Sequence, residues 1–510
     1  MLAKVYSATP RGVGALFVTV EVDRTRAQMP SVTVVGLPDT AVREARERVL
    51  AAIRRLGRQA EPANVVINLS PADERKEGAS LDLPIAIGLL AASGEIPPQA
   101  LEGRLVLGEL SLEGRLMPVR GVLPIALAAR ARGVAEIIVP AANGDEGSVV
   151  EGVELLSSST LGEVVRHLRG DEVLAPAVAP PVSAEPNQGS AVDLDEVVGQ
   201  EQARRALEVA AAGGHHLLFI GPPGSGKSML ARRLPTILPP LRRDEALEAT
   251  CVYSVSSRVP RPAGLLRRRP FRAPHHTISA AALIGGGSAP QPGEVSLAHC
   301  GVLFLDELTE FRRDVLEGLR QPLEDREVTV ARARAALTFP AKLQLVAAAN
   351  PCPCGHLGNA QRQCSCTPTA VHRYRGRLSG PLLDRIDLQV LVPAVPWKDL
   401  CGRSRGEASS EVAARVLRAR GLQTRRLGES GAVTNAEMGP AEIQRWATPD
   451  DAGRRLMERA TATLGLSARA YHRCLRVART VADLEGVEQV GAAHVAEAIA
   501  YRALDREGMG

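Results

Sequence analysis

The stretch that decides the fold is His215-His216-Leu217-Leu218-Phe219-Ile220-Gly221-Pro222-Pro223-Gly224-Ser225-Gly226-Lys227-Ser228. The apolar run 217–220 predicts a buried strand, and the turn after it matches G-x4-G-K-[ST] at the start of a helix. The glycines let the backbone curl so that its N–H groups face phosphates, and the helix N-terminus adds favourable partial charge. Lys227 would reach the β- and γ-phosphates, and Ser228 would hold Mg²⁺. We therefore expect ATP and Mg²⁺ here, bound by Gly221, Pro222, Pro223, Gly224, Ser225, Gly226, Lys227 and Ser228.

Composition narrows the class of protein without identifying a partner. The 510 residues are 45% apolar and 23% charged, which is typical of soluble globular proteins and argues against disorder and collagen. The net charge of +5 is too small to indicate nucleic-acid binding by itself. No run approaches the roughly 18 apolar residues of a membrane span, and the first residues lack a signal-peptide pattern. We expect no membrane contact and a cytoplasmic location, which suits eight cysteines without a disulfide framework.

The chain divides at a proline-rich stretch. Residues 171–193 carry four prolines and no helical period, so they read as a linker. Strand and helix signals alternate before it in 1–170 and after it in 194–395, and charged helices follow in 396–510. The predicted fold class is therefore α/β, with an amino-terminal α/β domain, a central P-loop α/β core and a carboxyl-terminal helical domain.

Acidic and amide residues follow two further predicted strands. Asp306 and Glu307 end the buried run VLFL, where two acids are costly unless paired with positive charge. Asp306 can hold the same Mg²⁺ as Ser228, and Glu307 can take a proton from the attacking water. The alternative is that both acids cap a helix. Asn350 follows another strand and can orient the water or the γ-phosphate, or it is a turn residue before Pro351.

Two basic segments are candidates for contact with a polymer. Arg268, Arg269 and Arg272 precede a glycine-rich tip, and phosphate binding suits such a loop. The run 327–338 alternates like a hairpin, which would put Arg332 and Arg334 on one face. For both segments a solvated surface is the alternative. The pair His275-His276 lacks a cysteine or carboxylate at ligand spacing, so it does not indicate a metal site.

Four cysteines cluster as Cys352-x-Cys354 and Cys364-x-Cys366. Four thiolates this close in sequence can bind Zn²⁺ tetrahedrally and staple the loop after Asn350. Free buried thiols or oxidation are the alternatives.

These motifs resemble the YifB/ComM family of magnesium-chelatase-like AAA+ ATPases. The resemblance covers nearly the whole chain and is carried by VVGQEQARRALEVAAAGGHHLLFIGPPGSGKS, FRAPHHTIS, GEVSLAHCGVLFLDEL, NPCPCG and LLDRID. It implies a homo-oligomeric, hexameric ring with active sites at subunit boundaries. It assigns Lys227 and Ser228 to Walker A, Asp306 and Glu307 to Walker B, and Asn350 to sensor 1. It further implies that Arg385 is an arginine finger and Arg469 is sensor 2 on a helical lid; a salt bridge and a solvated helix face are the alternatives for these two.

By the same resemblance, residues 1–170 look like the Lon-protease-like (S5-type) domain. RKEGASLDLPIAIGLL places Ser80 where such proteases carry their serine, and the matching lysine position holds Leu123. A lone hydroxyl is weakly nucleophilic, so we expect no protease, and we expect Ser80 to cap the following helix.

The function implied is an ATP-hydrolysing ring motor acting on single-stranded or branched DNA, a branch-migration helicase used in DNA integration during natural transformation. Three alternatives remain: a magnesium-chelatase motor subunit, an ATP-driven protein remodeller, and an ATP-gated scaffold without turnover. In related helicases the hairpin before sensor 1 points into the ring channel, which would let Arg332 and Arg334 grip the DNA backbone.

Overall fold

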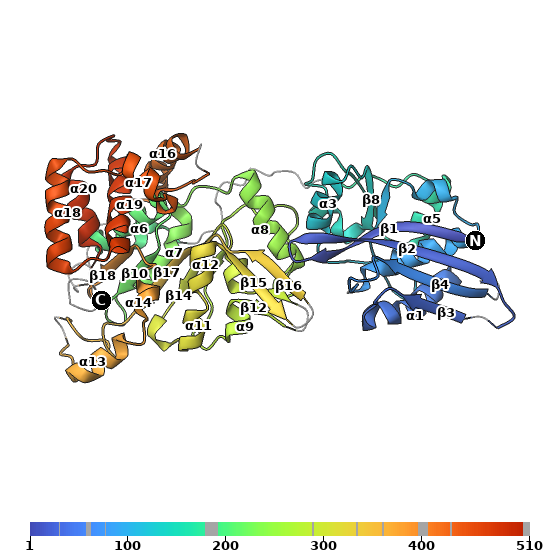
Figure 1. Cartoon of the computed structure of the whole chain (residues 1–510), viewed down its shortest axis with the longest axis horizontal. Helices are drawn as coiled ribbons and strands as arrows, with labels where there is room; N and C mark the ends of the chain where they lie inside the picture. The colour runs from blue at the N-terminus through green and yellow to red at the C-terminus, as the bar shows by residue number, and fades with distance from the viewer. Residues whose placement is uncertain are drawn as a thin grey trace.

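The computed structural model describes residues 1–29, 31–57, 63–76, 78–178, 192–287, 290–332, 335–359, 362–395, 406–428 and 431–502. Figure 1 shows an elongated molecule in which an amino-terminal part, a middle sheet and a group of carboxyl-terminal helices follow one another along the long axis. The predicted α/β class with carboxyl-terminal helices is confirmed. Among the described helices, none combines the length and hydropathy that crossing a membrane requires.

The amino-terminal part is built on a seven-stranded mixed sheet. Its strands, in spatial order, are β3 (Ser31–Val35), β4 (Ala63–Ser70), β2 (Gly14–Arg26), β1 (Leu2–Arg11), β5 (Arg104–Val106), β8 (Glu136–Pro140) and β9 (Glu154–Ser158). The helices are α1 (Thr40–Arg55), α2 (Asp82–Ala92), α3 (Val122–Ala131), α4 (Gly144–Gly147) and α5 (Leu161–Arg169). Helix α1 buries Val42, Ala45, Val49 and Ala52, as the 3.6-residue spacing predicts. A two-stranded ribbon, β6 (Glu109–Leu110) with β7 (Leu116–Met117), completes this part.

The stretch expected as a linker lies largely outside the described residues, which omit 179–191. Leu174 is buried, and the Ala177 N–H donates to the Leu155 carbonyl at 2.7 Å. Residues 174–177 therefore still pack against strand β9.

The middle part holds a five-stranded parallel sheet. Its spatial order is β11 (Phe271–Arg272), β14 (Val302–Leu305), β17 (Gln344–Ala349), β10 (Leu217–Ile220) and β18 (Leu388–Leu391). Strands β10, β14 and β17 are completely buried, which explains their continuous apolar runs. The longer helices of this part are α6 (Glu201–Gly213), α7 (Lys227–Ile237) and α8 (Arg243–Val255). Shorter ones are α9 (Ala280–Leu283), α10 (Glu294–Leu297), α11 (Arg313–Glu317), α12 (Arg320–Asp325), α13 (Pro368–Arg375) and α14 (Gly380–Leu383).

Two small antiparallel ribbons leave this core. One joins β12 (Gly285–Gly286) to β13 (Gln291–Pro292). The other joins β15 (Glu327–Arg332) to β16 (Ala335–Pro340), with Arg332 paired to Ala335. The second ribbon is the hairpin that the alternation in 327–338 predicts. Arg334 lies outside the described residues.

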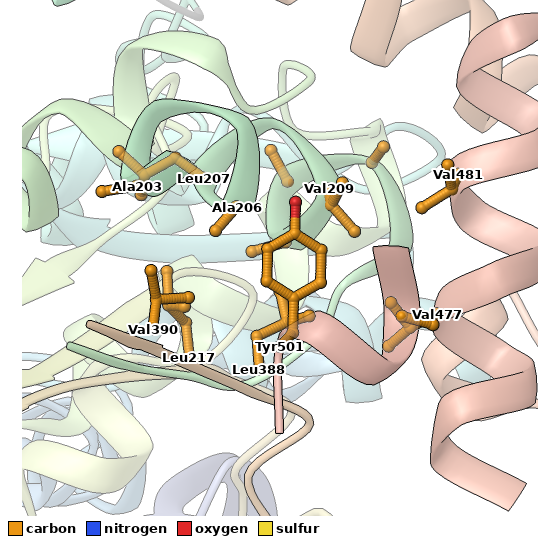
Figure 2. Close-up of a cluster of buried hydrophobic side chains, with 14 of the residues drawn as sticks. Ala203, Ala206, Leu207, Val209, Leu217, Leu388, Val390, Val477, Val481 and Tyr501 are labelled. Atoms are coloured by element: carbon orange, nitrogen blue, oxygen red, sulfur yellow. The ribbon is translucent and has the colours of Figure 1, made fainter. Parts of the chain in front are cut away.

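The carboxyl-terminal helices share a core with the parallel sheet. They are α16 (Ser409–Leu427), α17 (Pro440–Trp446), α18 (Asp451–Leu464), α19 (Ala468–Glu485) and α20 (Ala492–Ala500). Figure 2 shows the ring of Tyr501, just after α20, among side chains of α6, β10, β18 and α19. The Tyr501 hydroxyl donates to Glu497 at 2.8 Å, which satisfies its one polar group. Helices α16, α18, α19 and α20 are therefore packed against the sheet by one continuous hydrophobic cluster.

The amino-terminal part contacts the middle part through α8 and the β15–β16 hairpin (Figure 1). The Gly121 N–H donates to the Ser254 carbonyl at 3.2 Å, and Arg261 donates to the Val119 carbonyl at 3.1 Å. At the turn between β1 and β2, a Cβ added to Gly12 would lie 3.5 Å from the Thr338 carbonyl oxygen. The turn therefore lies against the hairpin.

Candidate functional site

The phosphate loop, residues 221–228, connects β10 to α7. Gly224 and Gly226 have φ of 78° and 91°, in the left-handed region that glycine enters without steric cost. Lys227 begins α7 and is buried, and its Nζ donates to the carbonyls of Gly221 at 2.7 Å and Pro222 at 2.9 Å. Its ammonium is thus held over the loop.

Strand order brings four polar side chains together at one edge of the sheet. β17 lies between β10 and β14 in parallel register, so the carboxyl ends of all three strands meet. Ser228 Oγ donates to Asp306 Oδ2 at 2.5 Å, and Lys227 Nζ donates to Asn350 Oδ1 at 3.3 Å. A hydroxyl bonded to a carboxylate is a ligand pair suited to Mg²⁺, a cation that prefers oxygen. The residues present therefore fit a magnesium nucleotide.

A cavity of about 400 Å³ opens at this edge. The described residues that line it run from Pro223 to Met229 and then include Asp306, Glu307 and Ala348 to Asn350. Burial lowers the pKa of Lys227, and the charges of Asp306 and Glu307 oppose that shift. Bound phosphates would add negative charge next to the lysine and further favour its charged form.

Glu307 is held by a residue that the sequence did not connect to it. Its φ of 52° is unusual for a residue other than glycine, and its side chain is 54% exposed. His276 Nδ1 lies 3.1 Å from Glu307 Oε2. The sequence offered no signal for this pair, because the two residues lie on separate segments and a local ligand spacing was the only test available for His276.

Arg385 and Arg469 lie away from the phosphate loop of their own chain. Arg385 precedes β18 at the amino-terminal edge of the sheet, where it forms an ion pair with Glu324 and donates to the Pro381 carbonyl at 2.7 Å. Arg469 is exposed at the start of α19. Its charge and that of Arg385 both lower the pKa of Glu324, with the Arg385 hydrogen bond as the largest cause. The structure thus brings the two arginines to one edge and the phosphate loop to the opposite edge.

The basic segment divides into buried and exposed arginines. Arg269 pairs with Glu245 at 2.9 Å, and Arg272 pairs with Glu294 at 2.7 Å. Arg269 also donates to the carbonyls of Pro239 and Cys300, so both arginines hold elements of the fold together. Arg269 and Arg272, two of the expected DNA contacts, therefore already have acidic partners within this chain. Arg268 is exposed.

The hydroxyl of the serine at the Lon-like position has no hydrogen-bond partner among the described residues. Ser80 Oγ is buried without a hydrogen bond, and Leu123 is buried in α3. The nearby Lys76 donates to the Glu74 carbonyl at 2.7 Å. Ser80 does not cap α2, which contradicts our expectation, because a short 3₁₀ turn over Ala79–Leu81 precedes that helix.

Comparisons with known proteins agree with this arrangement. The family models described as magnesium chelatase subunit ChlI match residues 193–400 and 20–143, and its carboxyl-terminal model matches 406–502. The competence protein ComM of Haemophilus influenzae is 45% identical, over 99% of this chain and 98% of that protein. The YifB protein of Salmonella typhimurium is 44% identical over the same shares. Lon protease 2 of Bacillus subtilis is 30% identical over 142 residues, 28% of this chain and 24% of the protease. The chain therefore belongs to the ComM/YifB family of magnesium-chelatase-like AAA+ proteins, with a Lon-like amino-terminal part.

Proposed function

We propose that this chain is an ATP-hydrolysing motor that acts on DNA. The observation that carries the ATPase part is the joint placement of Lys227, Ser228, Asp306 and Asn350 around one cavity. The loop N–H groups and Lys227 would bind the phosphates, and Ser228 and Asp306 would hold Mg²⁺, which neutralises phosphate charge when bound. Asn350 would orient the γ-phosphate or the attacking water. Glu307 would accept the proton of that water, since its carboxylate lines the same cavity.

A ring of identical chains follows from the position of the two arginines. Arg385 and Arg469 lie at the sheet edge opposite the loop, so a guanidinium beside the γ-phosphate would come from a neighbouring copy. A head-to-tail interface of this kind forms a ring when its rotation closes, and we propose a closed ring of six chains.

DNA is the proposed polymer, single-stranded or branched. Support comes from the hairpin that carries Arg332 and Arg334, from exposed Arg268, and from the Haemophilus relative, which is named a competence protein. Basic side chains bind the phosphate backbone without reading its sequence. The segment after Arg268 leads to His276, so DNA contact there would act on Glu307 directly. We propose branch migration during DNA integration as the activity.

The experiment compares ATP hydrolysis without polymer, with single-stranded DNA, with duplex and with a four-way junction. We expect stimulation by DNA that the double change Arg332→Ala/Arg334→Ala abolishes while basal turnover persists. Arg454→Ala/Arg455→Ala is the matched control, because it removes two exposed arginines on α18. Lys227→Ala should abolish turnover, and Glu307→Gln should bind ATP without splitting it. Equal rates in all arms, with no DNA binding, would overturn the DNA proposal and leave the ATPase.

The family description favours a second candidate, a motor subunit for magnesium insertion into a porphyrin. This candidate predicts that the ATPase rate is the same with and without DNA and changes when partner subunits are added. An arm with unfolded polypeptide tests a third candidate, a protein remodeller.

A further inference from the structure

Four cysteine thiols converge beside the phosphate loop. The Sγ atom of Cys352 lies 3.4 Å from that of Cys354 and 3.7 Å from that of Cys364, and Cys354 and Cys364 are 3.6 Å apart. The Sγ atom of Cys366 completes a set in which all ligand atoms lie within 4.8 Å of one another. Zinc–sulfur bonds of about 2.3 Å in a tetrahedron require sulfur atoms about 3.8 Å apart. A disulfide would require about 2.05 Å, so the spacing is that of metal ligands.

The backbone around the thiols is arranged for negatively charged sulfur. The N–H groups of Leu357 and Cys366 donate to Cys352 and Cys364 at 3.3 and 3.4 Å. The N–H groups of His356 and Ser365 donate to Cys354. Such bonds orient thiolate ligands and offset part of their charge. Four sulfur ligands in a tetrahedron suit zinc, with iron as the competing metal.

The cluster follows directly on Asn350. Cys352 is two residues beyond it, and Gly355, between the two cysteine pairs, faces the phosphate loop. A Cβ built on Gly355 would lie 2.5 Å from Pro223 Cδ, closer than real Cβ contacts. The cysteine loop and the phosphate loop are therefore in direct contact.

We propose that Cys352, Cys354, Cys364 and Cys366 bind one structural Zn²⁺, which fastens this loop against Pro223 and so supports nucleotide binding. The first half of this proposal, zinc binding by the four cysteines, is independent of the proposed function. The second half, the support of nucleotide binding, rests on it. The zinc restrains the backbone between Asn350 and α13, where Arg375 Nε also donates to the Pro351 carbonyl at 2.9 Å. It takes no part in splitting ATP.

Metal content tests the first half. We expect one zinc per chain by elemental analysis of the full-length protein, and a tetrahedral thiolate spectrum after exchange for Co²⁺. Cys364→Ser/Cys366→Ser should lose the zinc, whereas Cys474→Ala, at a buried thiol in α19, should keep it. Iron instead of zinc, or wild-type protein with no metal and four reactive thiols, would overturn the proposal.

A matched pair of glycines tests the second half. Gly355 and Gly358 have φ of 79° and 75°, so alanine is equally strained at both, but an added Cβ meets nothing within 4 Å at Gly358. Gly355→Ala should keep its zinc and weaken binding of a fluorescent ATP analogue about tenfold. Gly358→Ala should keep both its zinc and the wild-type affinity for the ATP analogue. Equal affinities of the two variants for the ATP analogue would overturn the proposal that the contact with Pro223 supports nucleotide binding. If the wild type binds no ATP, the proposed function fails while the zinc content still stands.

Discussion

At the scale of single residues, the pair His276 and Glu307 connects the chemistry to the rest of the chain. A general base must be free to reach its water, yet Glu307 Oε2 lies 3.1 Å from an imidazole nitrogen. The ring of the neighbouring His275 lies tilted against that of His276, with centroids 4.1 Å apart, and its Nδ1 is hydrogen-bonded to the Thr277 hydroxyl instead. Of the two histidines, His276 therefore contacts the Glu307 carboxylate, and His275 packs against His276.

Replacing His276 should uncouple hydrolysis from the polymer. His276→Ala releases Glu307, so we expect ATP affinity to stay at the wild-type value and the basal rate to change by no more than about threefold. Stimulation by DNA should disappear, because the link between the basic segment and the base is gone. His275→Ala is the matched control and should keep the stimulation. Full DNA stimulation of His276→Ala would show that the pair transmits nothing.

The imidazole of His216 allows a prediction of how the folding stability depends on pH. Burial lowers its pKa from 6.5 to about 4, although the charge of Asp387 opposes the shift, and its Nδ1 accepts from the Leu345 N–H at 3.0 Å. Between these two values the unfolded chain binds a proton that the folded chain does not, so stability falls as the pH drops from 6.5 to 4. The remaining charged groups that act on it, Arg473, His215 and Arg326, further disfavour protonation.

The loss should be on the order of 1–3 kcal/mol, measured as the change in unfolding free energy by urea titration across this window. His216→Asn keeps an acceptor for the Leu345 N–H but cannot take up a proton in this range. Its curve should be flatter between pH 6.5 and 4 than that of the wild type. Identical slopes for the two proteins would assign the acid sensitivity to other groups.

At the scale of helices and strands, the sequence patterns predicted those elements whose formation depends mainly on neighbouring residues. The run 217–220, the phosphate loop and α7 form one continuous segment, and the helix over 40–55 buries the residues that its spacing indicates. The positions of Asp306 and Asn350 beside the phosphate loop follow from these strands, because the carboxyl ends of parallel strands meet at one edge of the sheet.

What the sequence could not predict depends on partners far along the chain. Arg269 and Arg272 read as a free basic run, but Glu245 and Glu294 neutralise them from α8 and α10. The link between His276 and Glu307 is of the same kind. Ser80 failed as a cap because one short turn shifted the start of α2. Tertiary contacts decided the arginines and the His276–Glu307 pair, whereas a local 3₁₀ turn decided Ser80.

Helix α8 is fastened to the amino-terminal part by one buried carboxylate. Glu146 of α4 accepts from the Leu123 N–H at 3.2 Å, from Asn143 Nδ2 at 3.1 Å and from the Ser254 hydroxyl of α8. Three elements therefore depend on a single side chain that is 3% exposed.

Removing that carboxylate should loosen the junction. Glu146→Leu leaves the Leu123 N–H and the Ser254 hydroxyl without this acceptor, while Asn143 Nδ2 keeps the Val119 carbonyl. We therefore expect a loss of about 3 kcal/mol, seen as a lower thermal unfolding temperature of the full chain. Asp145→Leu removes the neighbouring, exposed carboxylate and should change the temperature little. An equal effect of both changes would contradict a role specific to the buried network.

At the scale of the whole molecule, the two ends of the parallel sheet carry the two halves of the proposed active site. The phosphate loop lies at the carboxyl ends of the strands, and Arg385 and Arg469 lie at the amino ends. The amino-terminal part extends along the long axis (Figure 1) and contacts strand β16 of the hairpin near Thr338. One copy of the chain therefore contains both halves but cannot join them.

Mixing two inactive variants tests whether neighbours join them. Lys227→Ala lacks a working phosphate loop but keeps Arg385, and Arg385→Ala has the reverse defect, so each alone should show no turnover. In a mixed ring, the loop of an Arg385→Ala chain meets the arginine of a Lys227→Ala chain, and about a quarter of the interfaces become complete at equal proportions. ATP hydrolysis should therefore reappear on mixing and peak near equal amounts. The double variant Lys227→Ala/Arg385→Ala, added in place of either partner, cannot supply the missing half and should restore no hydrolysis. Hydrolysis that stays absent in every mixture, while the chains demonstrably assemble together, would place each arginine on its own chain's nucleotide and rule out the shared site.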